Sequence, residues 1–202
     1  MREITDHWAR KAKTEGYPAR SVYKLKEIQE KFAVIPRRGR VLDLGAAPGS
    51  WSLFVLRLCG TGCRVIAADL EPLAISAQPE LVFFQGDIFA EELLCRLEAE
   101  GPYDALLCDA APATTGNRAV DSSRSEALVE QALVIAARML KPGGACVVKL
   151  FQGGGEKRIR EEMKNSFTAV KAFKPKATRS VSFETFFIGQ GKKPTAPGEP
   201  LK

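Results

Sequence analysis

Apolar and polar positions along the chain follow two periods, one typical of buried strands and one of amphipathic helices. Short apolar runs predict seven strands, at residues 41–44, 64–68, 81–85, 105–108, 145–150, 169–173 and 185–188. Helical spacing predicts helices at residues 51–58, 91–98, 123–140 and 156–165. A further amphipathic helix is predicted at residues 19–32, where Val22, Leu25, Ile28 and Phe32 share one face.

The alternation of strands and helices predicts an α/β, Rossmann-like fold, in which a mostly parallel seven-stranded sheet has helices on both faces. Ligands of such sheets bind beyond the carboxyl ends of the strands. The segment KPKATRSVSFE leaves no room for a helix between the last two strands, so we expect the last strand to be antiparallel. Residues 1–190 are expected to form a single domain with a basic N-terminal helical segment, and residues 191–202 a disordered tail rich in Gly, Pro and Lys.

The first strand and the loop after it have the sequence VLDLGAAPGSWS, residues 41–52. A loop that cradles a pyrophosphate has the pattern G-x-G-x-x-G, but here the middle glycine is absent and Pro48 removes one backbone donor. The loop instead suits an adenosine without phosphates, contacted by the backbone near Gly45 and Gly49 and by an aromatic wall at Trp51. S-adenosylmethionine (SAM) is a ligand of this kind.

Carboxylates follow three successive strands. Asp69 lies about 20 residues past the loop, where an acid takes ribose hydroxyls in such folds. Asp87 is expected to take the adenine amine, and Asp43, at the end of the first strand, to face the cationic end of SAM. Leu70 and Ile88 complete the predicted cofactor contacts. Each acid alone is equally compatible with a helix cap or a solvated turn, but acids at successive strand ends predict a SAM site.

The net charge of +6 is unevenly distributed along the 202 residues. Residues 1–40 and residues 156–202 each carry a net charge of +6, whereas residues 41–155 carry −6. The acidic centre suits a cationic methyl donor, and the two basic ends predict a surface for a polyanion. A solvated surface with chance asymmetry is the alternative interpretation.

Composition argues against several other classes of protein. No apolar run is long enough to span a bilayer and the polar N-terminus lacks the apolar core of a signal peptide, so we expect a cytoplasmic location and no membrane partner. The five cysteines include no C-x-x-C motif, which argues against a disulfide framework or a metal site. The single histidine, His7, is a poor candidate for a Ser-His-Asp triad because it lies in a polar segment.

Four charged residues lie where chemistry at the strand ends would need them. Asp109 ends the fourth strand, in CDAAPATTG, and Lys149 lies within the apolar fifth strand, in VVKLFQG. A lysine there is costly unless it has partners, although a lysine at a strand edge can also reach water. Glu184 precedes the last strand and Lys24 lies on the first helix. For these two residues alone, surface charge is the alternative.

The chain resembles the FtsJ/RrmJ (RlmE) family of ribosomal RNA ribose 2′-O-methyltransferases in five motifs, which occur in the family's order and spacing: SVYKLKEI, VLDLGAAPGSW, DAAPATTG, VVKLFQG and SFE. The resemblance extends over residues 17–189. It implies a catalytic tetrad of Lys24, Asp109, Lys149 and Glu184. It also implies SAM contacts at Gly49, Trp51, Asp69, Asp87 and Asp109. Three positions depart from the family pattern without removing a functional group, namely Ser50, Ala110 and Phe183.

The resemblance implies a SAM-dependent, metal-independent enzyme that methylates a ribose 2′-hydroxyl. A uridine of large-subunit (23S) rRNA within the ribosomal subunit is the expected substrate, and a tRNA or another RNA is the alternative. Lys149 is expected either to act as general base or to stabilise the developing oxyanion. As a base it must be tuned by burial and by a nearby cation such as Lys24, while Asp109 and Glu184 hold the lysines in place.

The basic ends are then expected to bind RNA around the site, in a protein that acts as a monomer. The residues predicted for this surface are Arg10, Lys11, Lys13, Arg20, Arg37, Arg38, Lys174, Lys176 and Arg179. Two remote alternatives remain. A nucleotide-dependent oxidoreductase is disfavoured by the missing glycine, and a catalytically silent RNA-binding protein is disfavoured by the intact tetrad.

Overall fold

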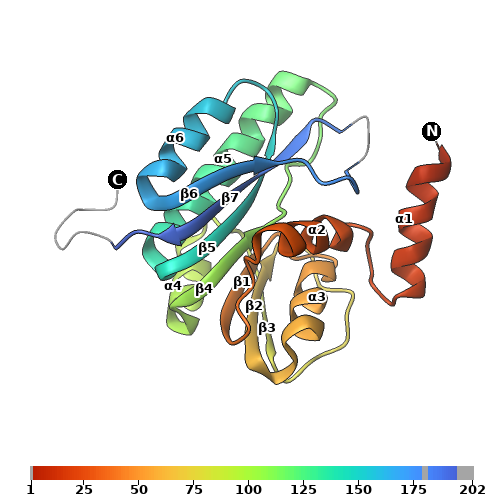
Figure 1. Ribbon diagram of the computed structural model, residues 1–202, viewed down its shortest axis with the longest axis horizontal. Coiled ribbons are helices and arrows are strands. Elements are labelled where there is room, and N and C mark those ends of the chain that lie inside the picture. The colour runs from red at the N-terminus through yellow and green to blue at the C-terminus, as the bar shows by residue number, and fades with distance from the viewer. Residues whose placement is uncertain (1, 179–181, 195–202) are drawn as a thin grey trace.

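The computed structural model describes residues 2–178 and 182–194, with side chains from residue 7 onward. Its centre is a seven-stranded sheet with the order β3-β2-β1-β4-β5-β7-β6 (Figure 1). The strands are β1 (Gly39–Leu44), β2 (Cys63–Asp69), β3 (Leu81–Gln85), β4 (Tyr103–Cys108), β5 (Leu140–Phe151), β6 (Phe167–Phe173) and β7 (Glu184–Lys192). All seven predicted strands are therefore present.

Helices cover both faces of the sheet (Figure 1). One face carries α2 (Val22–Phe32) and α3 (Ser50–Cys59), which is followed by the short 3-10 helix η1 (Gly60–Gly62). The other face carries α4 (Glu91–Glu100), α5 (Arg118–Met139) and α6 (Glu156–Ser166). Each set of helices buries its own hydrophobic cluster against the sheet, as the predicted two-sided covering requires.

The strands β1 to β5 run parallel, and β7 is antiparallel to both β5 and β6. This confirms the predicted mostly parallel sheet with an antiparallel last strand. The chain passes from β1 outward to β2 and β3 and then returns to β4 on the other side of β1. The strand order therefore reverses between β1 and β4, and a ligand is expected beyond the carboxyl ends of these strands.

The first helix, α1 (Arg2–Thr14), is not predicted by the hydrophobic pattern. Among its described side chains, from residue 7 onward, Ala12 and, four residues earlier, Trp8 pack in a small cluster with Tyr17 and Tyr23. Their neighbours in the sequence are mostly polar, so the hydrophobic pattern there is weak.

Several predicted boundaries differ from the structure, among them the start of β5, which is Leu140 rather than residue 145. Helix α5 begins at Arg118 rather than at residue 123 because the Asn117 side chain accepts hydrogen bonds from two backbone N–H groups and caps the helix. Strand β7 continues to Lys192, which lies opposite Phe167, so the predicted tail does not begin at Gly191. Residues 195–202 of that predicted tail lie outside the described residues.

Candidate active site

The loop after β1 touches the end of β4 at Gly45. Gly45 has a φ of 71°, and a Cβ atom there would lie 2.5 Å from the backbone of Ala110. Only glycine combines this left-handed conformation with such a close approach. The contact places the loop beside Asp109 at the point where the strand order reverses.

A cleft of about 350 Å³ opens beyond the carboxyl ends of β1 to β4. The predicted cofactor residues that line it are Gly45, Asp69, Leu70, Asp87, Ile88 and Asp109. The other lining residues are not predicted from the sequence, namely Ala47, Glu71, Gly86, Ala110, Ala111 and Leu128. Most of these are chain neighbours of predicted residues, so a local signal existed. Leu128 is different, because only the fold brings α5 to the cleft.

The lining of the cleft is acidic and apolar. It contains four carboxylates, and in the described part of the chain no Lys or Arg lines it. This composition suits a cationic ligand and not a pyrophosphate, which needs donors or cations. Leu70 is 63% exposed and gives an apolar surface beside Asp69 that an adenine ring can cover. The residues present therefore fit SAM.

Asp69 connects the loops on two sides of the cleft. Its Oδ2 accepts a hydrogen bond from Ala47 N and its Oδ1 accepts one from Glu71 N, both at 2.9 Å. Each carboxylate oxygen has two lone pairs, so both can accept a second hydrogen bond from a ribose hydroxyl. Asp87 Oδ1 accepts a hydrogen bond from Phe89 N at 3.0 Å in the same manner.

Four predicted cofactor residues do not line the cleft, namely Asp43, Pro48, Gly49 and Trp51. The prediction of an aromatic wall at Trp51 is wrong, because the ring is 2% exposed and packs near Phe186 in the core.

Asp43 is fully buried beneath the loop. Its Oδ2 accepts a hydrogen bond from Ser52 Oγ at 2.7 Å, whereas its Oδ1 has no hydrogen-bond partner among the described residues. Burial raises the pKa of the Asp43 carboxyl to about 7. The hydrogen bond from Ser52 opposes this rise, and the charges of Asp109 and Asp69 add to it. An unpartnered buried carboxylate oxygen is what a nearby cationic ligand would stabilise.

The start of α3 holds the segment that precedes α2. Ser50 Oγ accepts a hydrogen bond from Ala19 N at 2.7 Å and donates one to Ala19 O at 3.1 Å. Trp51 Nε1 donates to Ser21 O at 3.0 Å. These bonds fix the N-terminus of α2 one turn before Lys24. The loop that borders the cleft therefore also positions Lys24.

Two buried ion pairs unite the four predicted catalytic residues. Cys108 lies opposite Val148 in the register of β4 and β5, which brings the next residues, Asp109 and Lys149, together. Lys149 Nζ lies 2.8 Å from Asp109 Oδ1 and donates to Asp109 O at 2.5 Å. Lys24 Nζ lies 2.5 Å from Glu184 Oε1. Each lysine therefore has its own carboxylate.

The two ion pairs lie on the same face of the sheet. Phe186 is directly opposite Lys149 in β7, and Lys24 Nζ lies 5.7 Å from the centre of the Phe186 ring. The lysine and glutamate side chains are nearly buried, with 7% of Lys149, 9% of Lys24 and 7% of Glu184 exposed. Buried ion pairs recover their desolvation cost poorly, so they add little to stability. Their presence beside a cleft therefore favours a role in chemistry.

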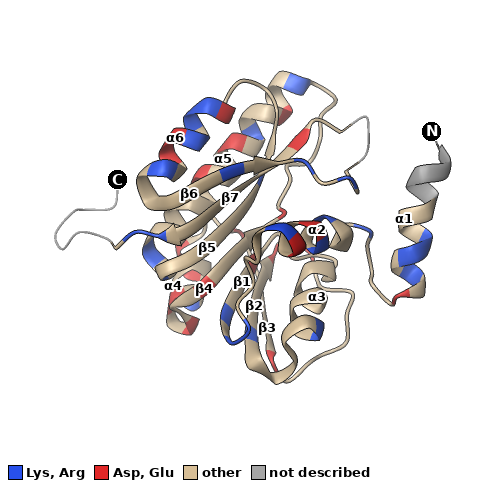
Figure 2. Cartoon of the chain, in the orientation of Figure 1, with Lys and Arg blue, Asp and Glu red and all other residues tan. Residues whose placement is uncertain are grey.

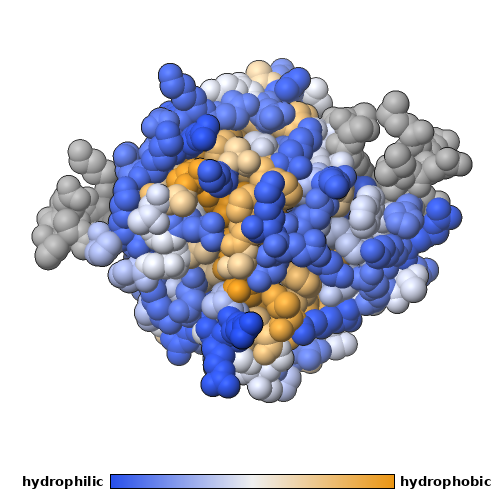
Figure 3. All heavy atoms as spheres, viewed as in Figure 1, coloured by the Kyte–Doolittle hydropathy of each residue, from blue (hydrophilic) through white to orange (hydrophobic). Residues whose placement is uncertain are grey.

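The two basic ends of the chain meet at α2. Glu27 on α2 accepts hydrogen bonds from the backbone N–H groups of Lys176 and Ala177, both at 2.8 Å. Lys and Arg lie on α1, on α2 and on the segment after β6 (Figure 2). In the space-filling view of this face, polar side chains surround a band of apolar surface (Figure 3). The N-terminal and C-terminal basic segments therefore contribute to one surface.

Arg37 and Arg38 do not border the site as predicted. They precede β1 and lie at the amino ends of the parallel strands, whereas the cleft lies beyond the carboxyl ends. The six residues of β1 separate these two edges by about 20 Å. Arg179, which was also predicted for the RNA surface, lies outside the described residues.

The described residues offer neither a metal site nor a membrane-spanning helix. No group of three or more His, Cys, Asp or Glu side chains is arranged to hold a metal ion in the described part of the chain. None of the described helices combines the length and the apolar character that crossing a bilayer requires.

Comparison with known proteins gives matches over most of the chain. The family model described as FtsJ-like methyltransferase matches residues 17–192. The chain is 52% identical over 185 residues to ribosomal RNA large subunit methyltransferase E of Treponema denticola, which covers 91% of this chain and 93% of that protein. It is 47% identical to the protein of the same name from Oleidesulfovibrio alaskensis, with 96% and 94% covered.

Solved structures share the fold. A ribosomal RNA methyltransferase from Plasmodium falciparum has a TM-score of 0.77 at 24% identity, over 87% of this chain and 98% of that chain. Human methyltransferase-like protein 13, solved in complex with SAH, has a TM-score of 0.62 at 15% identity, over 87% and 86%. These likenesses confirm the predicted Rossmann-like fold.

The raised pKa of Asp43 predicts a pH-dependent stability. An unfolded Asp titrates near pH 4, so the folded state binds this proton more tightly, and stability is lost as pH rises toward the folded pKa of about 7. Between pH 5 and pH 8 the free energy of unfolding should fall by about 1–3 kcal/mol more in the wild type than in Asp43→Asn. Urea denaturation at both pH values measures this, and equal falls would contradict it.

Removal of the Ser50 hydroxyl should destabilise the fold, because its hydrogen bonds to Ala19 are lost. In Ser50→Ala the partly buried N–H of Ala19 loses its acceptor, so the free energy of unfolding should fall by about 1–3 kcal/mol. Ser123→Ala, at an exposed serine of α5, is the matched control and should change little. The prediction fails if chemical denaturation gives the same midpoint for both variants.

Proposed function

Because the chain belongs to the FtsJ-like methyltransferase family, we propose that it transfers the methyl group of SAM to a ribose 2′-hydroxyl of large-subunit (23S) ribosomal RNA. The observation that carries this proposal is the pairing of Lys149 with Asp109 and of Lys24 with Glu184 beside an acidic cleft. The target is a uridine within the ribosomal subunit, and the enzyme acts as a monomer whose single domain extends to Lys192, the last residue of β7.

The cleft residues divide the binding of SAM between its adenosine and its cationic end. Asp69 takes the ribose hydroxyls and Asp87 the adenine amine, while Leu70 covers one side of the ring. Asp109 lines the cleft and stabilises the positive charge, and a cation near the buried carboxyl of Asp43 favours its charged form and lowers its raised pKa. When bound, SAM supplies an electrophilic methyl group on its sulfonium.

Lys149 accepts the proton of the 2′-hydroxyl in this proposal. A neutral lysine amine has two N–H donors and one lone pair. Lys149 Nζ donates one hydrogen bond to the backbone carbonyl of Asp109. Asp109 Oδ1 lies 2.8 Å from Lys149 Nζ but accepts no hydrogen bond from the described residues. Once the amine has lost a proton, its lone pair accepts the hydroxyl proton while the backbone carbonyl holds the amine in place.

Lys24 orients the hydroxyl oxygen and stabilises the negative charge that develops on it. Glu184 holds Lys24 at 2.5 Å, and the bonds of Ser50 and Trp51 fix the start of its helix. The rate then depends on how well these groups align the hydroxyl oxygen with the methyl carbon and the sulfur.

Removal of the Lys149 amine should abolish methyl transfer without loss of SAM binding. General base catalysis contributes about 10²–10⁴-fold, so kcat of Lys149→Ala should fall by at least this range with the Kd for SAM nearly unchanged. Lys141→Ala is the matched control and should keep the wild-type kcat. Lys141 also lies on β5 and pairs at 2.8 Å with a carboxylate of β4, that of Asp104, but at the end of these strands opposite the cleft. Turnover of Lys149→Ala at the wild-type rate in a tritiated methyl transfer assay would remove Lys149 from the mechanism.

Salt should weaken RNA binding steeply and SAM binding hardly at all, because only RNA binding releases counterions. The paired variant Lys174→Ala/Lys176→Ala should reduce the slope of log Kd against log salt by about one for each phosphate that the protein no longer neutralises. Arg37→Ala/Arg38→Ala, at the opposite edge of the sheet, should leave the slope unchanged. The same slope for RNA and SAM, or for both variants, would contradict this division of the surface.

A further inference from the structure

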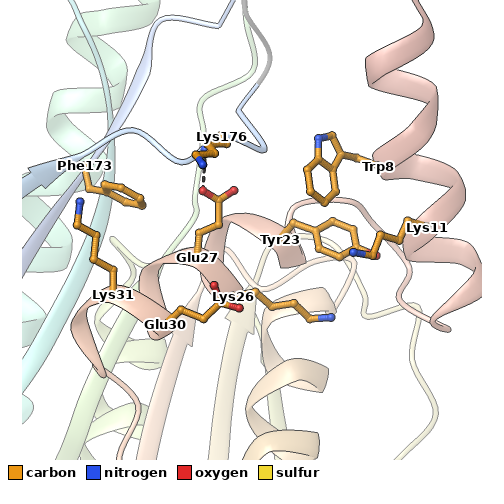
Figure 4. Close-up of a pocket in the computed structure, with 9 residues that line it drawn as sticks. All are labelled: Trp8, Lys11, Tyr23, Lys26, Glu27, Glu30, Lys31, Phe173 and Lys176. Atoms are coloured by element: carbon orange, nitrogen blue, oxygen red, sulfur yellow. Dashed lines mark hydrogen bonds between the residues drawn. The ribbon is translucent and has the colours of Figure 1, made fainter.

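A second hollow, of about 660 Å³, lies apart from the SAM cleft and shares no lining residue with it. It is formed by α1, by α2 and by the end of β6 with the segment that follows. We call it the α1–α2 groove. Trp8 and Phe173 lie at opposite ends of this groove, with Tyr23 and lysine side chains between them (Figure 4).

The aromatic rings of the α1–α2 groove offer surfaces for stacking. The Trp8 and Tyr23 rings lie 4.7 Å apart, and Trp8 remains half-buried, with one part of its surface open to solvent. Phe173 is also half-buried, and Lys31 Nζ lies 4.5 Å from the centre of its ring. Lys11 Nζ lies 5.4 Å from the centre of the Trp8 ring. Tyr23 is only 3% exposed, so it packs against Trp8 and offers no open face of its own. Each of the two half-buried rings therefore has a cation next to it.

The charge of the α1–α2 groove favours an anion. Its lining includes four lysines, Lys11, Lys26, Lys31 and Lys176, and two glutamates, Glu27 and Glu30. Lys26 is already paired with Glu15 at 2.6 Å. The carboxylate of Glu27 is already engaged, because both of its oxygens accept backbone hydrogen bonds from the segment after β6 (Figure 4). Aromatic rings interleaved with lysines are the arrangement by which proteins bind single-stranded nucleic acid, with bases on the rings and phosphates at the cations.

The position of the α1–α2 groove relates it to the ion pairs. Phe173 lies opposite Phe186 in the register of β6 and β7, and Phe186 lies opposite Lys149 in the register of β7 and β5. These three residues form one row across the same face of the sheet, so Phe173 is two strands, or about 10 Å, from Lys149. Tyr23 precedes Lys24 on α2. The groove therefore lies close enough to the ion pairs for nucleotides next to the methylated one to reach it, and Phe186, which lies between them, is itself buried.

We propose that the α1–α2 groove binds an unpaired stretch of the RNA substrate that adjoins the methylated nucleotide. Bases stack on Trp8 and Phe173, and Lys11, Lys31 and Lys176 contact the phosphates. This inference rests on the proposed function, since it names the part of the substrate that the catalytic site does not hold.

Trp8 gives a direct readout of this contact. The chain has two tryptophans, and Trp51 is 2% exposed, so quenching of fluorescence by a bound base reports on Trp8. A short single-stranded RNA oligonucleotide should quench the fluorescence of the full-length enzyme, and Trp8→Phe should abolish the quenching while keeping the KM for RNA close to that of the wild type. Trp8→Ala should raise the KM for RNA by about 5- to 100-fold, the range expected for the loss of one stacked base.

Two controls separate stacking from general damage to the fold. The kcat and the Kd for SAM should stay unchanged in Trp8→Ala, because its side chain touches neither the cleft nor the ion pairs. Lys31→Ala should raise the KM for RNA, whereas Lys157→Ala should not, because Lys157 is an exposed lysine of α6 on the other face of the sheet.

The possible results test RNA binding by the groove separately from the proposed methyl transfer. The wild-type enzyme could methylate RNA while RNA causes no quenching and Trp8→Ala leaves the KM for RNA unchanged. This result would overturn the proposal that the groove binds RNA and leave the proposed function intact. If RNA quenches the fluorescence, Trp8→Phe abolishes the quenching and no RNA is methylated, RNA binding by the groove is supported and the proposed methyl transfer is overturned. Trp8→Ala could also raise the KM for ribosomal subunits while free RNA causes no quenching. This result would mean that the groove contacts a ribosomal protein, and it would overturn the proposal.

Discussion

Two lysines held against two carboxylates, in a place that water hardly reaches, are the feature on which the rest of this site depends. Desolvation makes such pairs expensive, and they persist only where rigid elements fix both partners. Here the register of β4, β5 and β7 sets Asp109, Lys149 and Glu184 at one edge of the sheet, and α2 brings Lys24 to them. The sheet therefore supplies the precision that positioning a hydroxyl requires.

The loop after β1 connects the methyl donor's cleft with the catalytic lysines. At one end, Gly45 lets the loop pack against Ala110 beside the cleft. At the other end, Ser50 and Trp51 hold the backbone that leads into α2. A single segment thus places the donor site and Lys24 relative to each other. Its proline and its missing glycine, which make it unsuitable for a pyrophosphate, leave it free for this second task.

The sequence predicts what is local in this structure and misses what is assembled from distant segments. The strands and the acids Asp69 and Asp87 are predictable because a strand's period and the residue at its end lie within a few positions. The Trp51 ring was wrongly assigned to the ligand because its burial depends on Phe186, far along the chain. Arg37 was wrongly placed around the site because charge alone does not tell one edge of a sheet from the other.

The central claim is that these ion pairs serve methyl transfer to a ribose oxygen and not to a base. A methyl group on the 2′-oxygen blocks attack of that oxygen on the neighbouring phosphate, so alkali cannot cleave the RNA there. The most direct test is to label large ribosomal subunits with tritiated SAM and this enzyme, and then to hydrolyse the rRNA in alkali. The label should appear in an alkali-resistant dinucleotide that contains uridine. Label in mononucleotides would mean that a base was methylated and would contradict the account.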